Sequence, residues 1–222
     1  MPNRRVPLQL TVALLLACLA AACAPGANVE RAPAFTAAWN GPIETVALVM
    51  SPPASSVRVF AESTYNLSSL EFLRHPYARQ RFDVIERARM DVVLNELGLG
   101  QSGLVDTSTA PQLGRLLGAR YVIVVDLINL SVRPSSLSGL RLSGVPLGFG
   151  MADLDITLMV RMVDVETGRV RASGAGRVQD VIFTGISVDG LDFSSPATRE
   201  LVLDLVPEAA LRAFNDLFRQ IV

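Results

Sequence analysis

Apolar and polar positions follow two different periods along this chain, and together they predict a mixed α/β fold. Compact apolar runs predict buried strands at residues 43–50 and 121–130. Strict alternation predicts another strand at 154–162, a turn at 164–169, and extended chain from there to about Val188. A shorter alternating run, 81–86, adds a brief strand. We expect one mixed-sheet domain flanked by helices.

Helical spacing of leucines and other apolar residues predicts the covering layers. Residues 66–74 and 90–97 each carry an apolar stripe, and Gly98 ends the second. A further helix begins near Thr109 and ends at Gly118. The C-terminal region, from Ser195 on, is also helical in its spacing, and Pro207 either kinks it or starts a second helix.

The first residues have the order of a secretory signal. Arg4 and Arg5 precede an apolar run over 8–22, which closes on small residues directly before Cys23. Small residues ending in cysteine are what lipoprotein processing requires, since the thiol carries the diacylglycerol. We therefore predict lipidation at Cys23. Cys18 is a competing acceptor, and a plain secreted protein cut at an A-x-A site or an uncleaved anchor are the alternatives.

The domain organisation follows from this processing site. Residues 1–22 are expected to be a lipoprotein signal peptide, 23–41 a lipidated tether rich in Ala, Pro and Gly, and 42–222 the folded domain. Ala24, and not Asp, follows the cysteine, so the outer membrane is the expected location, with the domain facing the periplasm.

Composition narrows the possible chemistry. The chain has 222 residues and a net charge of -1, which gives no electrostatic basis for nucleic-acid binding. Cys18 and Cys23 are its two cysteines, so the mature domain is expected to have no disulfide and no thiolate metal site. We predict no cofactor, no metal and no catalytic residue.

Two features that resemble catalytic or binding motifs have simpler interpretations. The glycines of residues 98–103 have the spacing of a dinucleotide fingerprint, but they follow a helix instead of joining a strand to one, so a loop is the better interpretation. His75 is the one histidine, and its sequence neighbours include no orienting carboxylate. We expect it on the surface or in a loop.

The Gly/Ser/Pro-rich stretch 132–152 has an unusual alternation. In its second half, Val145, Leu147, Phe149 and Met151 alternate with Pro, Gly and Ala, and before the bend Leu140 and Leu142 alternate with small or polar residues. An apolar-out, small-or-polar-in pattern of about ten residues is typical of a lipid-facing strand. We therefore consider this stretch a candidate membrane hairpin; a surface loop or a flap packed on the domain is the alternative.

Several segments resemble the curli-secretion lipoprotein family (CsgG/HfaB-like). They are FDVIER at 82–87, VVLNE at 92–96, LGRLLGARYVIV at 113–124 and VDVETGR at 163–169, and with the lipidation site they span most of 43–178. The resemblance implies a periplasmic α/β domain, an outer-membrane lipid anchor and a ring of identical subunits. In the curli branch, each subunit adds two hairpins to a shared barrel through which unfolded amyloid subunits are exported.

The resemblance also implies where the two hairpins fall. The first would be 132–152, and the second would be confined to 178–193, which is short for two membrane strands. Two functions follow. The chain is expected to belong to a secretion channel for curli-like or adhesin subunits, or to be a periplasmic accessory lipoprotein that binds another envelope protein, as penicillin-binding-protein activators do. The short tether favours the first, and the short second hairpin favours the second.

Overall fold

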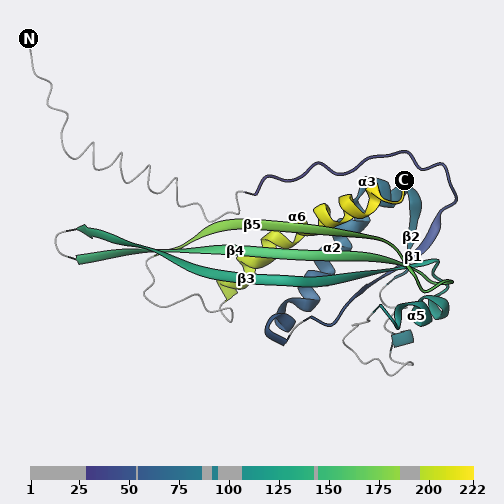
Figure 1. The fold of residues 1–222 in the computed structure, drawn as a ribbon, viewed down its shortest axis with the longest axis horizontal. Coiled ribbons are helices and arrows are strands. Elements are labelled where there is room, and N and C mark those ends of the chain that lie inside the picture. Colours follow the sequence, from purple (N-terminus) through teal and green to yellow (C-terminus); the bar gives the residue numbers. More distant parts are fainter. Residues whose placement is uncertain (1–28, 54, 87–91, 95–106, 143–144, 186–195) are drawn as a thin grey trace, which may run out of the picture.

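A five-stranded mixed sheet forms the centre of the molecule (Figure 1). The computed structural model describes residues 29–53, 55–86, 92–94, 107–142, 145–185 and 196–222. The strands are β1 (Glu44–Met50), β2 (Phe82–Val84), β3 (Tyr121–Leu142), β4 (Val145–Asp164) and β5 (Val170–Gly185), in the order β2-β1-β3-β4-β5. β1 pairs in parallel with β2 and β3, whereas β3, β4 and β5 are antiparallel. The predicted mixed α/β fold is confirmed.

The helices cover the two faces of the sheet differently. They are a 3-10 turn η1 (Ser55–Phe60), then α2 (Ala61–Arg74), α3 (Pro76–Arg81), α5 (Ala110–Leu117) and α6 (Pro196–Arg219). α2 and α6 pack on one side, which we call the helix face, around a core that includes Phe72, Phe214 and Phe218. On the other side, the open face, α5 packs over the end of the sheet near the β4–β5 turn.

Strand alternation explains why one sheet serves both cores. In β4, the residues Leu154, Ile156 and Leu158 are fully buried in the helix-face core. In β3, Val122 and Val124 are buried in the α5 core, while their neighbours Ile123 and Val125 belong to the helix-face core. Successive side chains of a strand point to opposite faces, so these central strands are apolar on both sides where both faces are covered.

Helix α6 approaches β5 more closely than any side chain would permit. A Cβ placed on Gly176 would lie 1.9 Å from the carbonyl oxygen of Ala209, and one on Gly174 would lie 2.1 Å from that of Ala213. The helix contributes alanines at this contact, and the strand contributes glycines, which have no side chain. Two glycines in alternate positions of β5 therefore seat the C-terminal helix on the sheet.

The structure corrects several predicted helix boundaries. α2 begins at Ala61, before the expected Asn66, and Pro76 starts α3 as its first residue, where a missing N–H costs nothing. α6 runs through Pro207 as one helix, so the alternative of a second helix is wrong. Gly118 ends α5 with φ of 71°, as expected of a helix-terminating glycine. Of the helix expected at 90–97, the structure describes 92–94, which are helical.

The N-terminal segment lies on the domain. Residues 29–40, which we call the strap, have no secondary structure, yet Val29, Phe35 and Trp39 pack against the helix-face core. The strap begins beside the middle of the sheet and runs along α6 to the end of the domain opposite the hairpin (Figure 1). This differs from the expected extended tether, because apolar and polar groups of the segment find partners on α2, α3 and α6.

The projecting hairpin and its charged base

β3 and β4 continue past the helices as a long hairpin (Figure 1). Their register is described as far as the pair Leu142 and Val145, next to the tip. The stretch 132–152 is therefore part of two continuous strands, which corresponds to the hairpin interpretation and not to a surface loop.

The register of the hairpin brings its apolar positions together. Leu142 pairs with Val145, Leu140 with Leu147, and Leu137 with Phe149. Residues directly opposite in an antiparallel pair share a face. The register shift between Leu137 and Leu140 keeps these leucine positions in phase. One face of the hairpin therefore carries the large apolar positions of both strands, and the other carries mostly proline, glycine and serine positions.

The alternation of β4 inverts where the hairpin leaves the body. Within the body, the even-numbered positions from Leu154 to Met162 are apolar and face the helices. Beyond Asp153, the odd-numbered positions from Met151 to Val145 are apolar instead. The apolar positions of the hairpin thus have the opposite parity to the positions of β4 that face the helices in the body. This inversion is visible in the sequence, but the sequence pattern alone does not show which positions of β4 face the helices.

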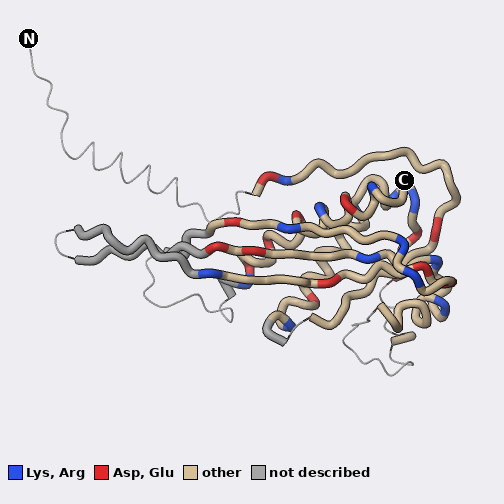
Figure 2. The backbone as a smooth tube through the Cα atoms, viewed as in Figure 1, with Lys and Arg blue, Asp and Glu red and all other residues tan. Residues whose placement is uncertain are grey.

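Charged residues mark the base of the hairpin. They lie on three adjacent strands: Arg133 on β3, Asp153 and Asp155 on β4, and Arg177 and Asp180 on β5. Figure 2 shows charged residues of both signs on this part of the sheet. Arg133 and Asp153 occupy paired positions. Beyond this base, 134–152 contains one charged residue, Arg141. We call the five residues the charged base.

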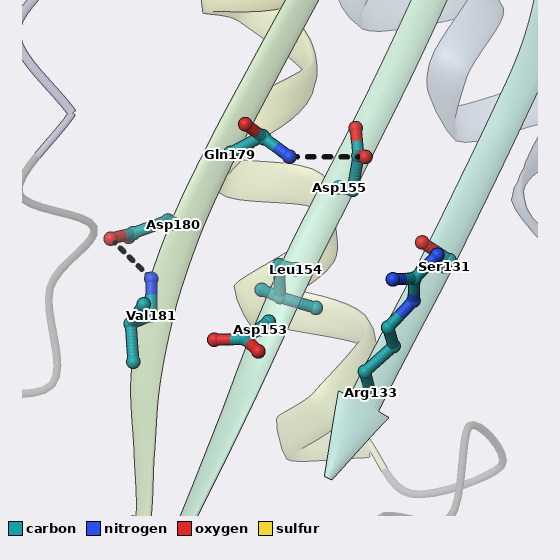
Figure 3. Close-up of a pocket in the computed structure, with 8 residues that line it drawn as sticks. All are labelled: Ser131, Arg133, Asp153, Leu154, Asp155, Gln179, Asp180 and Val181. Carbon is teal, nitrogen blue, oxygen red and sulfur yellow. Dashed lines mark hydrogen bonds between the residues drawn. The ribbon is translucent and has the colours of Figure 1, made fainter. Parts of the chain in front are cut away.

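Four residues of the charged base, all except Arg177, line a shallow hollow of about 440 Å³ on the open face (Figure 3). Ser131, Asp155 and Gln179 lie in one row across the three strands, and the Gln179 amide donates to Asp155 Oδ2 at 3.2 Å. Arg177 binds the same carboxylate with two nitrogens, the Nε to Oδ1 contact being 2.9 Å. The hydrogen bonds from Arg177 lower the pKa of Asp155 below its ordinary value. The carboxylate is thus held ionised as a structural partner.

A second ion pair continues this polar row towards α5. Arg161 of β4 donates from Nε and Nη2 to the two oxygens of Asp126 on β3, each at 2.9 Å. Asp126 is 7 % exposed. A fork-to-carboxylate pair of this kind fixes the two strands against each other. The pairs Asp155 with Arg177 and Asp126 with Arg161 therefore cross-link neighbouring strands on the open face of the body.

The outer edges of β3 and β5 are closed in the body. On β5, α6 supplies Gln220 to the Ser173 backbone, Asp216 to the Ala175 N–H at 3.1 Å and Arg212 to the Arg177 carbonyl at 3.0 Å. On β3, strand β1 covers the edge up to Val125, which accepts from the Ser51 N–H at 2.9 Å. Further towards the tip, neither edge has a strand neighbour within the described residues.

The predicted site residues have different outcomes. Cys23 and the glycines of 98–103 lie outside the described residues, as does the end of the segment 178–193 after Gly185. His75 lies in the connection between α2 and α3, as one of its two expectations had it, but it is not on the surface. It is 2 % exposed, and Asn215 of α6 provides its ring with a partner that the sequence does not reveal. Among the described residues, no helix has the length and apolar character needed to cross a membrane.

The sequence of this chain matches a known protein family. The model of the family described as "Curli production assembly/transport component CsgG" matches residues 76–200, more than half of the sequence. The chain belongs to the CsgG family. The match includes β3, β4 and β5, and hence the hairpin and its charged base. A comparison with curated protein sequences gave no match.

Solved structures of low sequence identity share parts of this arrangement. The LpoB C-terminal domain from Escherichia coli is 18 % identical, with a TM-score of 0.37, over 61 % of this CsgG-family chain and 82 % of the other. Lipoprotein GNA1162 from Neisseria meningitidis is 12 % identical, with a TM-score of 0.38, over 74 % and 95 %. A PelC dodecamer from Paraburkholderia phytofirmans is 11 % identical, with a TM-score of 0.33, over 77 % of this chain and 87 % of the other.

Proposed function

We propose that this CsgG-family chain is an outer-membrane lipoprotein whose folded domain faces the periplasm. The signal pattern over 1–22 and the cysteine that follows it support export and acylation at Cys23. Membership of the CsgG family supports a role in the assembly or transport of curli-type proteins. The acyl chains hold the domain at the membrane, and the folded domain makes the protein contacts that assembly or transport requires.

The position of the strap limits how far the domain can lie from the lipid. The Glu30 carbonyl and the Arg177 carbonyl both accept hydrogen bonds from Arg212, so the start of the strap lies at the level of Arg177 on β5. Six residues lie between Cys23 and Glu30, so the two are joined by seven residue steps, about 25 Å of fully extended chain. From the same level, β4 extends about 40 Å to its start at Val145, at roughly 3.4 Å per residue. Measured from the level of Arg177, the start of β4 at Val145 therefore lies farther away than Cys23 can reach.

The hairpin is proposed to enter the bilayer. Beyond the charged base, each strand has eight or nine described residues, about 25–30 Å, which is close to the apolar band of an outer-membrane strand. The apolar positions gather on one face, and charge is confined to Arg141 near the tip. The inverted alternation at Asp153 carries this proposal, since it gives the apolar positions of the hairpin the opposite parity to those that the helices cover.

Insertion requires more than one copy. A single hairpin in hydrocarbon would leave backbone N–H and C=O groups unpaired along its outer edges. We therefore propose that identical subunits form a ring and together line a passage for unfolded amyloid or adhesin subunits. The edges of β3 and β5 that are open towards the tip are the surfaces available for contact between copies.

A second candidate function is that of a periplasmic accessory lipoprotein that binds and regulates another envelope protein, without a pore. One observation favours it. β3 and β5 both run towards the tip, with β4 between them. In copies that share one orientation on the membrane, β5 of one would lie parallel to β3 of the next, whereas transmembrane barrels consist of antiparallel strands.

Extraction in mild detergent distinguishes the two functions. For the channel, we expect light scattering to give a multiple of the acylated chain mass with a detergent belt, and the purified particle to conduct ions in a planar bilayer. A monomer that remains in solution after enzymatic removal of its acyl chains, without conductance, would contradict the channel and support the accessory function.

A further inference from the structure

Besides its apolar packing, the strap is attached to the domain through a few polar side chains. Arg31 binds Glu71 of α2 at 2.6 Å, and the Ala32 N–H donates to Glu208 of α6 at 3.0 Å. The carboxylates of Glu71 and Glu208 belong to residues that are only 3 % and 7 % exposed. Removing the strap would leave these two buried carboxylates without their hydrogen bonds to Arg31 and Ala32, which costs free energy. The strap is therefore held in one defined position on the domain.

Asn215 is the central point of attachment. Its Oδ1 accepts the Phe35 N–H at 2.5 Å, and its Nδ2 donates to the Pro33 carbonyl at 3.0 Å. The same Oδ1 lies 3.1 Å from Nε2 of His75. Since this oxygen is an acceptor, Nε2 must carry the proton.

This arrangement assigns one tautomer to His75. With the proton on Nε2, the other nitrogen, Nδ1, holds a bare lone pair; it is buried and has no hydrogen-bond partner among the residues that the structure describes. The ring also packs edge-on against Phe218, with centroids 4.6 Å apart. A second proton on Nδ1 would place an unsatisfied donor and a charge in this apolar contact.

We propose that the strap is a proton-sensitive latch. A second proton on Nδ1 leaves the Nε2–H donor to Asn215 in place, but it puts a charge and an unsatisfied donor in the buried contact with Phe218, which favours a state in which His75 and Asn215 separate and residues 29–40 leave the domain. Burial lowers the pKa of His75, which the Asn215 contact and the Glu71 carboxylate only partly oppose. The closed latch therefore binds fewer protons than the open one. It is favoured above the ordinary histidine pKa of about 6.5 and weakened as the pH falls below that value.

Other charged and titratable groups surround the latch and are paired within it. They are Arg31 on the strap, Glu71 on α2, Tyr77 and Arg81 on α3, and Glu208 and Arg212 on α6. Arg81 also lies over the Trp39 ring at 4.1 Å and donates to Glu44 at 2.7 Å. His75 is the chain's one histidine, so a transition near neutral pH is assigned to it.

Release of the strap changes how the domain is attached, a consequence that rests on the proposed acylation at Cys23. With the strap closed, about seven residues link Cys23 to the domain at Glu30. With it open, the link extends to β1, which begins at Glu44. The reach then rises from about 25 Å to about 70 Å at roughly 3.5 Å per residue.

Hydrogen–deuterium exchange of the full chain tests the latch without reference to the membrane. At pH 5.5, compared with pH 7.5, we expect protection of the Ala32 and Phe35 amides to fall by up to about tenfold after correction for intrinsic exchange. Ser51, whose amide donates to Val125 far from the latch, is the control and should be unchanged.

The matched variant is His75→Gln, whose side-chain amide retains a donor for Asn215 but does not titrate. We expect protection of Ala32 and Phe35 in this variant to be independent of pH between 5.5 and 7.5. Equal protection of the natural chain at both pH values overturns the latch, even if the variant does not fold, and so does a pH dependence that persists in a folded His75→Gln chain. Loss of membrane attachment in a Cys23 variant leaves this result unaffected, so the two proposals fail separately.

Discussion

Replacing Gly176 by valine is expected to destabilise the domain by about 3 kcal/mol or more, and so to prevent α6 from packing in its present position. A Cβ at this position would lie 1.9 Å from the Ala209 carbonyl oxygen and 2.6 Å from the Ala213 nitrogen. Both are backbone atoms of α6, which cannot move aside as a flexible side chain can, so the cost lies at or beyond the upper end of overpacking. Urea denaturation followed by circular dichroism measures the change.

Ala175→Val is the matched control for that variant. Ala175 is the preceding residue of the same strand, it is exposed, and its side chain alternates to the open face. We expect its stability to stay within about 0.5 kcal/mol of the natural chain. Similar denaturation midpoints for Gly176→Val and the natural chain would show that the close approach of α6 to β5 is wrong.

Replacing Cys23 by serine is expected to remove acylation and to move the protein from the membrane fraction to the soluble fraction of the envelope. Acyl chains contribute about 0.8 kcal/mol per buried CH2, so losing the proposed diacylglycerol removes the dominant membrane attachment of a single subunit. An isolated hairpin does not replace it, because its edges are unpaired. Intact-mass spectrometry and fractionation of cells report the two effects.

Cys18→Ser provides the control, since Cys18 is the competing acceptor in the same signal segment. This variant should remain acylated and in the membrane fraction. The opposite pattern, with Cys18→Ser soluble and Cys23→Ser still acylated, would transfer the lipid to Cys18. An unmodified mass for the natural chain would contradict lipidation altogether.

The central strands were predictable because both of their faces are buried. β1 and the first half of β3 are continuous apolar runs, and such runs arise where helices cover both sides of a sheet. Gly118 was predictable as a helix end for a local reason, its left-handed conformation. In these elements, local preference and tertiary packing agree.

The hairpin was predictable in part. Alternation at Val145 to Met151 indicated a strand, but strand length depends on pairing, and the register shift after Leu137 is a tertiary feature that sequence spacing does not reveal. The inversion at Asp153 required knowing which positions the helices cover. Once the even-numbered positions of β4 are known to face α6, strand alternation indicates that the apolar odd-numbered positions of the hairpin have a different partner.

His75 and the strap were misjudged for the same reason. Their partners lie far away in sequence: Asn215 is 140 residues from His75 and 180 from Phe35. A Pro- and Ala-rich segment without periodicity gives no local sign that it will pack, and a histidine beside a proline gives no sign of burial. Long-range polar contacts of this kind determine the candidate latch, and no local pattern encodes them.

The depth of the hairpin in the membrane is the most direct measurement of the proposed function. Nitroxide labels at Leu147→Cys in the hairpin and at Thr157→Cys in the body can be compared in the membrane-bound protein, where the natural Cys23 thiol is expected to be acylated. We expect the label at position 147 to be relaxed by dissolved oxygen and shielded from a water-soluble nickel chelate, and the label at 157 to show the reverse. Equal access of the nickel chelate to both positions would place the hairpin in water and contradict its insertion.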